Sequence, residues 1–237
     1  MKKTMTPTST TEGGKGQGPL RWLPGLLSFF VAMGLGHAVL SLPAVAPGLS
    51  GRVAEKLEAS GVGNPVTAVL LNFRGYDTLL ELGVLLLALL GVWSFGGMAE
   101  KRGPAPGPVL DALARLLVPL LILVAGYLLW VGAHAPGGAF QAGSVLAAAG
   151  VLLLLAGWRP EARFAGLPLR LVLVVGLATF VAVGMASMAL GGRLLEYPPP
   201  LAAALILLIE AMATLSIGVT LAAPFLGGRP GAEGGDE

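Results

Sequence analysis

The stretch LAAALILLIEAMATLSIGVTLAAPF, residues 201–225, contains one ionisable side chain, that of Glu210. As an α-helix these residues would extend about 37 Å, which exceeds the roughly 30 Å hydrocarbon core of a bilayer. Five other apolar runs of similar length precede it. The sequence therefore predicts an all-α, polytopic membrane protein with six transmembrane helices, near Leu23–Val45, Thr78–Phe95, Leu113–Val131, Gln141–Gly157, Leu167–Leu190 and Leu201–Phe225.

The overall composition agrees with a membrane protein. Hydrophobic residues make up 55% of the chain and charged residues 12%, with a mean hydropathy of +0.81, whereas soluble domains are about 25% charged. No basic stripe alternates with aromatic residues, so we expect no nucleic-acid partner. The chain has no cysteine and two histidines, which excludes disulfides and iron–sulfur clusters and makes a protein-only metal site unexpected. We expect no cofactor.

The distribution of positive charge predicts the orientation in the membrane. With the N-terminus in the cytoplasm, the inner connections and tails hold eleven of the 15 lysines and arginines, and the outer connections hold four. Because cytoplasmic loops retain the excess of positive charge, both termini are predicted inside, in a multi-pass protein of the cell (inner) membrane. Residues 1–20 and 227–237 are predicted cytoplasmic tails, the first disordered because it is almost free of apolar residues.

The segment 64–84, NPVTAVLLNFRGYDTLLELGV, places Arg74, Asp77 and Glu81 at the mouth of the second predicted helix. Their spacings of three and four put them on one helical face. Ionisable groups at such a position mark an ion or proton route, in which Arg74 would hold Asp77 ionised and leave Glu81 to exchange protons. A structural alternative is equally open, because Thr78 and Glu81 fit a capping box.

Glu210 is a second candidate for the ion path, because a lone carboxyl group deep in an apolar helix must be neutral or face a polar cavity or partner.

Residues 136–143, PGGAFQAG, form a tight turn before the fourth helix, and a plain helical hairpin is the favoured interpretation of that turn. Two stripes of small residues indicate close helix packing, either within the chain or onto another subunit. These stripes are Gly143, Ala147 and Gly150, and Ala178, Ala182 and Ala186.

Two motifs resemble parts of one transport system. RGYDTLLE at 74–81 resembles the C-terminal part of the large subunit of Mrp-type multisubunit sodium/proton antiporters. PGGAFQAG is similar to the PGGGFQGG signature of the MnhB-like subunit of the same antiporters, with Ala139 and Ala142 in place of glycines. The resemblance implies a two-helix region (residues 21–105) like the end of the large subunit, an MbhE-like region, followed by a four-helix MnhB-like domain (106–226). The motif residues that match are Pro136, Gly137, Gly138, Phe140, Gln141 and Gly143.

The resemblance implies an accessory antiporter subunit and not an enzyme, with other membrane subunits, the lipid bilayer, Na⁺ and H⁺ as its partners. Membrane-bound hydrogenases contain related segments, so the membrane arm of a redox-driven complex is a second hypothesis, and a purely structural scaffold is a third. One departure concerns the last helix. By resemblance, the family often has a carboxylate just before Ile-Gly-Val, whereas this chain has Ser216, with Glu210 six residues earlier.

Overall fold

The computed structural model describes residues 22–42, 48–95, 107–158, 164 and 166–226. The chain divides into two compact units, residues 1–48 and 49–237. Within the described residues all regular structure is helical, as the sequence predicts. The predicted tails, residues 1–20 and 227–237, lie outside this part.

In the first unit, α1 extends over Leu23–Leu40, with Pro24 in its first turn. Proline suits that turn because the missing N–H would have no partner there. The helix was predicted to continue to Val45, but residues 43–47 lie outside the described part.

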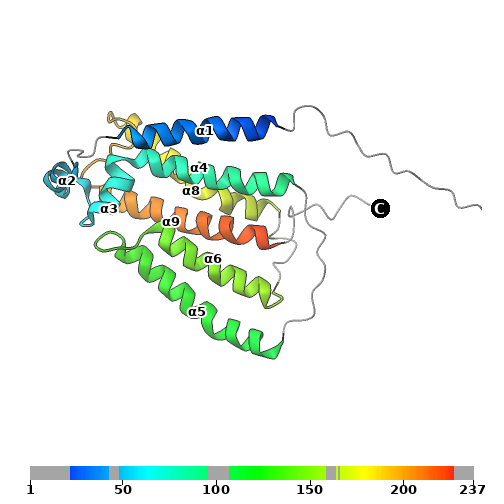
Figure 1. The fold of residues 1–237 in the computed structure, drawn as a ribbon. Coiled ribbons are helices and arrows are strands. Elements are labelled where there is room, and N and C mark those ends of the chain that lie inside the picture. Colours follow the sequence, from blue (N-terminus) through cyan, green and yellow to red (C-terminus); the bar gives the residue numbers. More distant parts are fainter. Residues whose placement is uncertain (1–21, 43–47, 96–106, 159–163, 165, 227–237) are drawn as a thin grey trace, which may run out of the picture. The chain divides into compact units, whose positions relative to one another are not determined.

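The second unit is a bundle of helices that run roughly side by side (Figure 1). Among the described helices of the whole chain, five are long and apolar enough to cross a membrane: α1, α4 (Gly75–Ser94), α5 (Pro108–Val131), α8 (Leu167–Ala189) and α9 (Ala202–Ala222) with its 3₁₀ extension η3 (Ala223–Leu226). The remaining predicted span is α6 (Ala139–Leu155), an apolar helix of 17 residues. Its length of about 25 Å is at the lower limit for a crossing.

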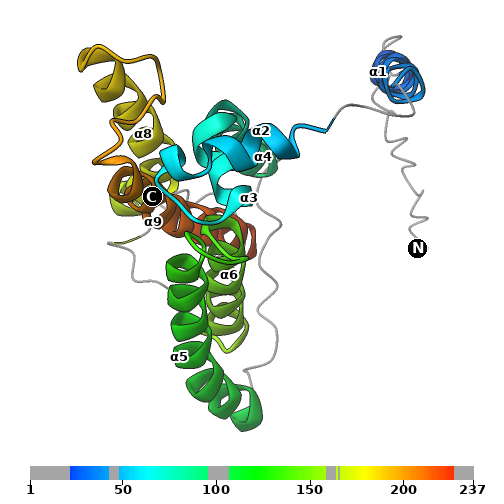
Figure 2. The ribbon, with the colours of Figure 1, turned by 90° about the vertical axis from the view of Figure 1, so that its left-hand side faces the viewer.

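The central helix of this unit is α9, which packs against α6 and α8, with α4 and α5 making smaller contacts. Figure 2 shows α5 and α6 on one side of α9 and α8 on the other. Close approach depends on glycines. A Cβ at Gly143 would lie 2.7 Å from Cγ2 of Ile217, and one at Gly176 would lie 2.8 Å from Cβ of Ser216. Tight packing of this kind replaces the hydrophobic driving force that lipid does not supply.

The two predicted small-residue stripes therefore differ in role. In α6, Ala147 is buried and a Cβ at Gly150 would lie 3.2 Å from Cβ of Ala222, so this stripe packs against α9. In α8 the alanine stripe is exposed, and the helix instead turns its buried residues toward the bundle. Those buried residues are Leu173, Gly176, Phe180, Val183, Gly184 and Ser187.

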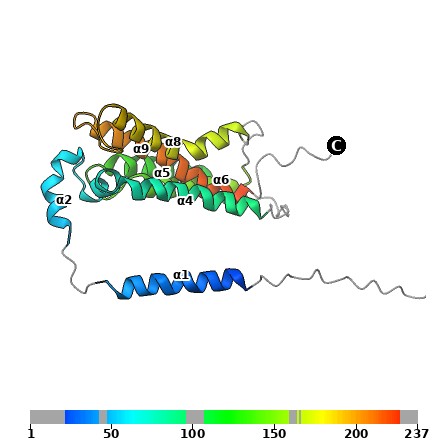
Figure 3. The same cartoon turned by 90° about the horizontal axis from the view of Figure 1, so that it is seen from above.

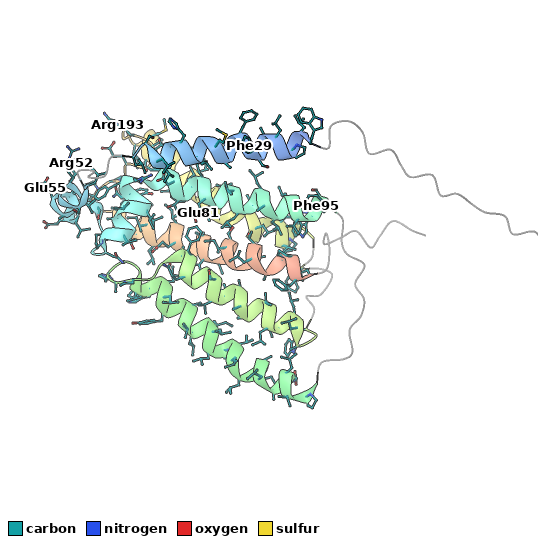
Figure 4. All side chains as sticks on the ribbon, viewed as in Figure 1. Phe29, Arg52, Glu55, Glu81, Phe95 and Arg193 are labelled. Atoms are coloured by element: carbon teal, nitrogen blue, oxygen red, sulfur yellow. The ribbon has the colours of Figure 1, made fainter. Side chains whose placement is uncertain are left out.

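Short helices that the sequence patterns did not predict cover one end of the bundle. They are α2 (Ser50–Lys56), η1 (Glu58–Ser60), α3 (Pro65–Ala68) and the π-helix η2 (Val69–Phe73). Figure 3 shows α2 lying across the direction of the bundle helices. Figure 4 shows Arg52 and Glu55 of α2 at the same end as Arg193, which follows α8. These segments escaped prediction because each is too short to show a hydrophobic period.

Candidate functional site

The turn between α5 and α6 is built from three glycines in backbone contact. The Gly138 N–H donates to the Leu128 carbonyl oxygen over 2.8 Å. A Cβ at Gly137 would lie 2.5 Å from that same oxygen, and one at Gly132 would lie 2.6 Å from the Gly138 nitrogen. Gly138 itself has φ +101°, a conformation that side chains other than glycine rarely adopt. The turn thus places the N-terminus of α6 inside the bundle. Because Gly138 has no side chain, the free N–H groups of this helix end are accessible to a neighbouring residue.

Glu210 meets that helix end. It is the ninth residue of α9, about 12 Å along the helix, and only 3% of it is exposed. The backbone N–H of Ala139, the first residue of α6, donates to its carboxylate. Oxygen Oε1 lies 2.6 Å from the position that a Cβ on Gly138 would take. Among the described residues, Oε2 has no hydrogen-bond partner. The structure therefore brings together the buried carboxyl group and the PGGAFQAG motif, which the sequence patterns presented separately.

The arrangement is favourable for a negative charge. The first turn of a helix carries free N–H groups and the positive end of the helix dipole, so a carboxylate at this end is stabilised. Burial acts in the opposite direction, because it removes the water that would solvate the charge. The helix end thus favours the charged form of Glu210, and burial favours its neutral form.

The other motif residues have structural positions. Phe140 is half-buried and packs against the main core cluster, and Gly143 contacts α9. Pro136 and Gln141 are exposed. Within the described residues, the Gln141 side chain makes no hydrogen bond to a neighbouring backbone group.

Two side chains from the segment before α4 hold the same turn from outside. The Asn64 Nδ2 donates to the Ala135 carbonyl oxygen over 2.6 Å, and Thr67 Oγ1 donates to the Gly132 carbonyl oxygen. Asn64 also caps α3, since its Oδ1 accepts from the Val66 N–H over 2.9 Å. Sequence reasoning missed both residues. The Asn-Pro pair at 64–65 is a helix-start signal that identifies the cap, but nothing local indicates the long-range bonds.

The acidic residues of α4 lie elsewhere. Arg74 pairs with Asp77, as predicted, but the two side chains are 65% and 51% exposed. Glu81, shown on α4 in Figure 4, is also exposed and has neither a hydrogen bond nor an ion pair within the described chain. Among the described residues, no hydrogen bond or ion pair joins Asp77 or Glu81 to Glu210. The structure thus keeps the two predicted ion-path candidates, Glu210 and the Asp77–Glu81 pair, at separate positions.

The capping-box interpretation of Thr78 and Glu81 is wrong. Helix α4 begins at Gly75, with Arg74 as its N-cap, so Thr78 is inside the first turns. Its hydroxyl donates to the Leu70 carbonyl oxygen over 2.6 Å. That carbonyl lies in the π-helix η2, where the helical hydrogen bonds are interrupted before α4. Thr78 therefore satisfies an acceptor of the preceding helix and not a free amide of its own.

A second hydroxyl group, in the α8–α9 connection, also donates to a carbonyl oxygen of η2. The Tyr197 hydroxyl donates to the Leu71 carbonyl oxygen over 2.9 Å. Burial raises the pKa of the Tyr197 phenol, so it remains a protonated donor at physiological pH. The short π-helix is thereby fixed by side chains from two sides, and π-helical turns of this kind often occur at functional sites.

In the described part of the chain, no group of three or more His, Asp and Glu side chains has the arrangement of a metal site. The fold and the site thus define a multi-pass, all-α membrane protein in which, among the described residues, one buried carboxyl group lies at a helix N-terminus. Residues 109–226 belong to the family of domains related to the MnhB subunit of Na⁺/H⁺ antiporters. This chain accordingly contains an MnhB-related domain over residues 109–226.

Two solved complexes contain chains with a similar fold. A chain of the membrane-bound sulfane sulfur reductase, an archaeal respiratory membrane complex, is 25% identical with a TM-score of 0.59, and 87% of this chain aligns with 96% of that one. A chain of the Mrp complex from Dietzia sp. is 24% identical with a TM-score of 0.60, and 91% of this chain aligns with 26% of that longer one. At this identity the second likeness concerns the fold alone. No curated protein matches the sequence.

Proposed function

We propose that this chain is an accessory membrane subunit of a multisubunit Na⁺/H⁺ antiporter in the cell (inner) membrane. The observation that carries the proposal is the match of residues 109–226 to the MnhB-related domain. The shared fold with a chain of an Mrp complex supports it. In this role the chain assembles with other membrane subunits and performs no bond chemistry, so it is not itself an enzyme.

We further propose that its carboxyl groups contribute to the ion path. Glu210 supports this idea because it is buried in a membrane helix with one unpartnered oxygen. Burial of such a group costs free energy, so ionisable residues within membrane helices usually mark functional positions. A pure scaffold would gain stability from an apolar residue at the same place. Asp77 and Glu81, with Arg74 beside Asp77, form the second acidic position. Because they are exposed on α4, they would act at a boundary with a partner subunit or with water.

The proposal is tested by purifying the full chain, tagged at its C-terminus, from membranes in mild detergent. Several other membrane subunits should be recovered with it. After reconstitution, the complex should exchange sodium for protons in liposomes that contain a pH-sensitive dye, and the separated chain should not. Exchange by the chain alone, or its recovery without any partner, would contradict the assignment.

One observation favours a second candidate, the membrane arm of a redox-driven complex. The aligned chain of the archaeal respiratory complex is matched over 96% of its length, whereas the Mrp chain is matched over 26%. The same purification separates the two candidates. Partners that contain iron–sulfur clusters would favour the redox complex, and partners limited to transport subunits would favour the antiporter.

A further inference from the structure

We infer that Glu210 takes up and releases a proton, and that it does not bind the sodium ion. The inference rests on the proposed function in one respect only, namely that the proton belongs to the exchange. It assigns to the contact between α9 and the N-terminus of α6 a specific ion, which neither the family nor the fold supplies.

The first step is the anchoring of one carboxyl oxygen. The Ala139 N–H donates to the Glu210 carboxylate, and Oε1 lies against Gly138, where the absent side chain leaves room for it. A neutral carboxyl group can accept the same hydrogen bond through its carbonyl oxygen. Protonation at Oε2 therefore leaves the anchor intact, and the side chain can change its charge without leaving its place.

The second step is the shortage of ligands for a metal cation. Hard cations in proteins are coordinated by several oxygens from carboxylates, carbonyls and water. Among the described residues, Glu210 belongs to no group of three or more acidic or histidine side chains that could hold a metal ion, and two α9 hydroxyl groups near it in sequence point their hydrogens at backbone oxygens. The Thr214 hydroxyl donates to the Glu210 main-chain oxygen over 2.8 Å, and the Ser216 hydroxyl donates to the Leu173 oxygen over 2.6 Å.

The polarity of the helix end also disfavours a metal cation. In membrane proteins, helix N-termini face anionic groups, whereas cations are coordinated by unwound carbonyls and helix C-termini. Glu210 contacts the N-terminus of α6, where the peptide dipoles present their positive ends. This end stabilises the carboxylate and repels a sodium ion placed beside it. A proton escapes that restriction because it enters as part of a neutral carboxyl group.

The charged and titratable side chains on the elements around α9 do not neutralise Glu210. They lie on α4 (with its N-cap), α5 and α8, whereas α6 and η3 carry none. Each is exposed or half-exposed, and within the described residues none forms a hydrogen bond or ion pair with Glu210. They are Arg74, Tyr76, Asp77, Glu81, Asp111, Arg115, Tyr127 and Arg170, to which the connections add the exposed His134 in the α5–α6 turn and the buried Tyr197, whose hydroxyl donates to the Leu71 oxygen. Within the described residues, no hydrogen-bonded side chain passes the proton to Oε2. Protonation forms an O–H bond at Oε2 and converts one hydronium ion to water.

Infrared difference spectroscopy tests the inference on the complete membrane complex that co-purifies with the chain. Spectra recorded in sodium-free buffer while the pH changes should contain the C=O band of a titrating, buried carboxylic acid. We expect Glu210→Gln to lose this band. The matched substitution Glu196→Gln, at an exposed carboxylate in the α8–α9 connection, should retain it.

A second measurement follows sodium directly. Titration of the same complexes with sodium chloride, monitored by ²²Na⁺ binding, should give an affinity within about twofold of wild type for Glu210→Gln, because the group is not a sodium ligand. If Glu210→Gln does not assemble, Gly138→Ala is used, since its Cβ would displace Oε1. We expect it to shift the midpoint of the carboxyl band and leave sodium affinity unchanged.

The outcomes separate this inference from the proposed function. Loss of sodium binding in Glu210→Gln, or in the substitute Gly138→Ala, would overturn it. So would a carboxyl band that survives the loss of Glu210, or the absence of any titrating band in wild type. A wild-type complex that shows the band but exchanges no sodium for protons would instead reject the antiporter assignment and retain the proton site.

Discussion

Oxygen Oε1 of Glu210 occupies the space that a side chain on Gly138 would fill, 2.6 Å from the position of its Cβ. The two residues are far apart in sequence, since Glu210 lies in α9 and Gly138 is the N-cap residue of α6, yet each restricts which residue the other position can accept. Gly138 must lack a side chain for the carboxylate to reach the Ala139 N–H. The carboxylate in turn satisfies one of the free amides that every helix N-terminus leaves.

Gly138→Ala should therefore destabilise the chain. Its φ of +101° costs about 1 to 3 kcal/mol for a residue with a Cβ, and the displaced Glu210 would lose its hydrogen bond from Ala139. Thermal unfolding of the detergent-purified protein, followed by tryptophan fluorescence, measures the effect. Gly126→Ala in α5 is the matched control, because nothing lies within 4 Å of its Cβ position. Equal melting temperatures for the two variants would contradict the role given to Gly138.

Thr67→Val should also lower stability, since it removes the hydroxyl that donates to the buried Gly132 carbonyl oxygen. Leaving such an acceptor unsatisfied costs about 1 to 3 kcal/mol. Thr67→Ser keeps the hydroxyl and should remain close to wild type in the same unfolding measurement. If the valine and serine variants unfold together, the hydrogen bond does not hold the turn.

The membrane class could be predicted from sequence because apolar length alone decides it. The run around Glu210 can only be stable as a buried or membrane helix, whatever its partners. The ends of α8 agree with prediction to one residue, since Gly166 and Gly191 bracket it. Helix α5 starts at Pro108 and not near Leu113, because Asp111 and Arg115 interrupt the apolar run but pair with each other one turn apart.

The site could be predicted only in part. Both Glu210 and the glycine turn were recognised, but their meeting depends on the packing of α6 against α9, and no local pattern contains that information. The same limit applies to Thr78. Its spacing from Glu81 fits a capping box, yet the π-helix before α4 moves the helix start to Gly75 and gives the hydroxyl another acceptor.

The contact of α6 with α9 yields a further prediction. Gly143→Val places branched carbon atoms where Cγ2 and Cβ of Ile217 already lie 2.7 and 2.8 Å from the Cβ position. Overpacking of this kind costs about 1 to 3 kcal/mol. Gly83→Val in α4 is the control, because the space around that glycine is empty within 4 Å. Comparison of the two melting temperatures tests whether this packing is as close as the structure indicates.

Thr78 and Glu81 should respond differently to substitution. Thr78→Val removes the donor to the Leu70 oxygen, and we expect a loss of about 1 kcal/mol or more in unfolding free energy. Thr78→Ser should retain most of the stability. Glu81→Gln should be neutral, because the side chain is exposed and has no partner within the described chain. Equal stability of Thr78→Val, Thr78→Ser and wild type would contradict the hydrogen bond to the Leu70 oxygen.

The final prediction concerns transport by the α4 carboxylates. If Asp77 and Glu81 contribute to the ion path, Glu81→Gln should slow sodium/proton exchange by about tenfold or more, at the low end of the effect of removing a proton-transfer group. Assembly should be unchanged, since Glu81 forms no hydrogen bond or ion pair within the described residues. Asp77→Asn should also slow exchange, because it leaves Arg74 without its counter-ion and adds uncompensated positive charge to a cation path. Both variants are measured in the reconstituted complex, with subunit recovery as the control for assembly. If both variants assemble and exchange ions at the wild-type rate across pH, these carboxylates are exposed side chains of α4 with no role in transport, and the ion path must lie elsewhere.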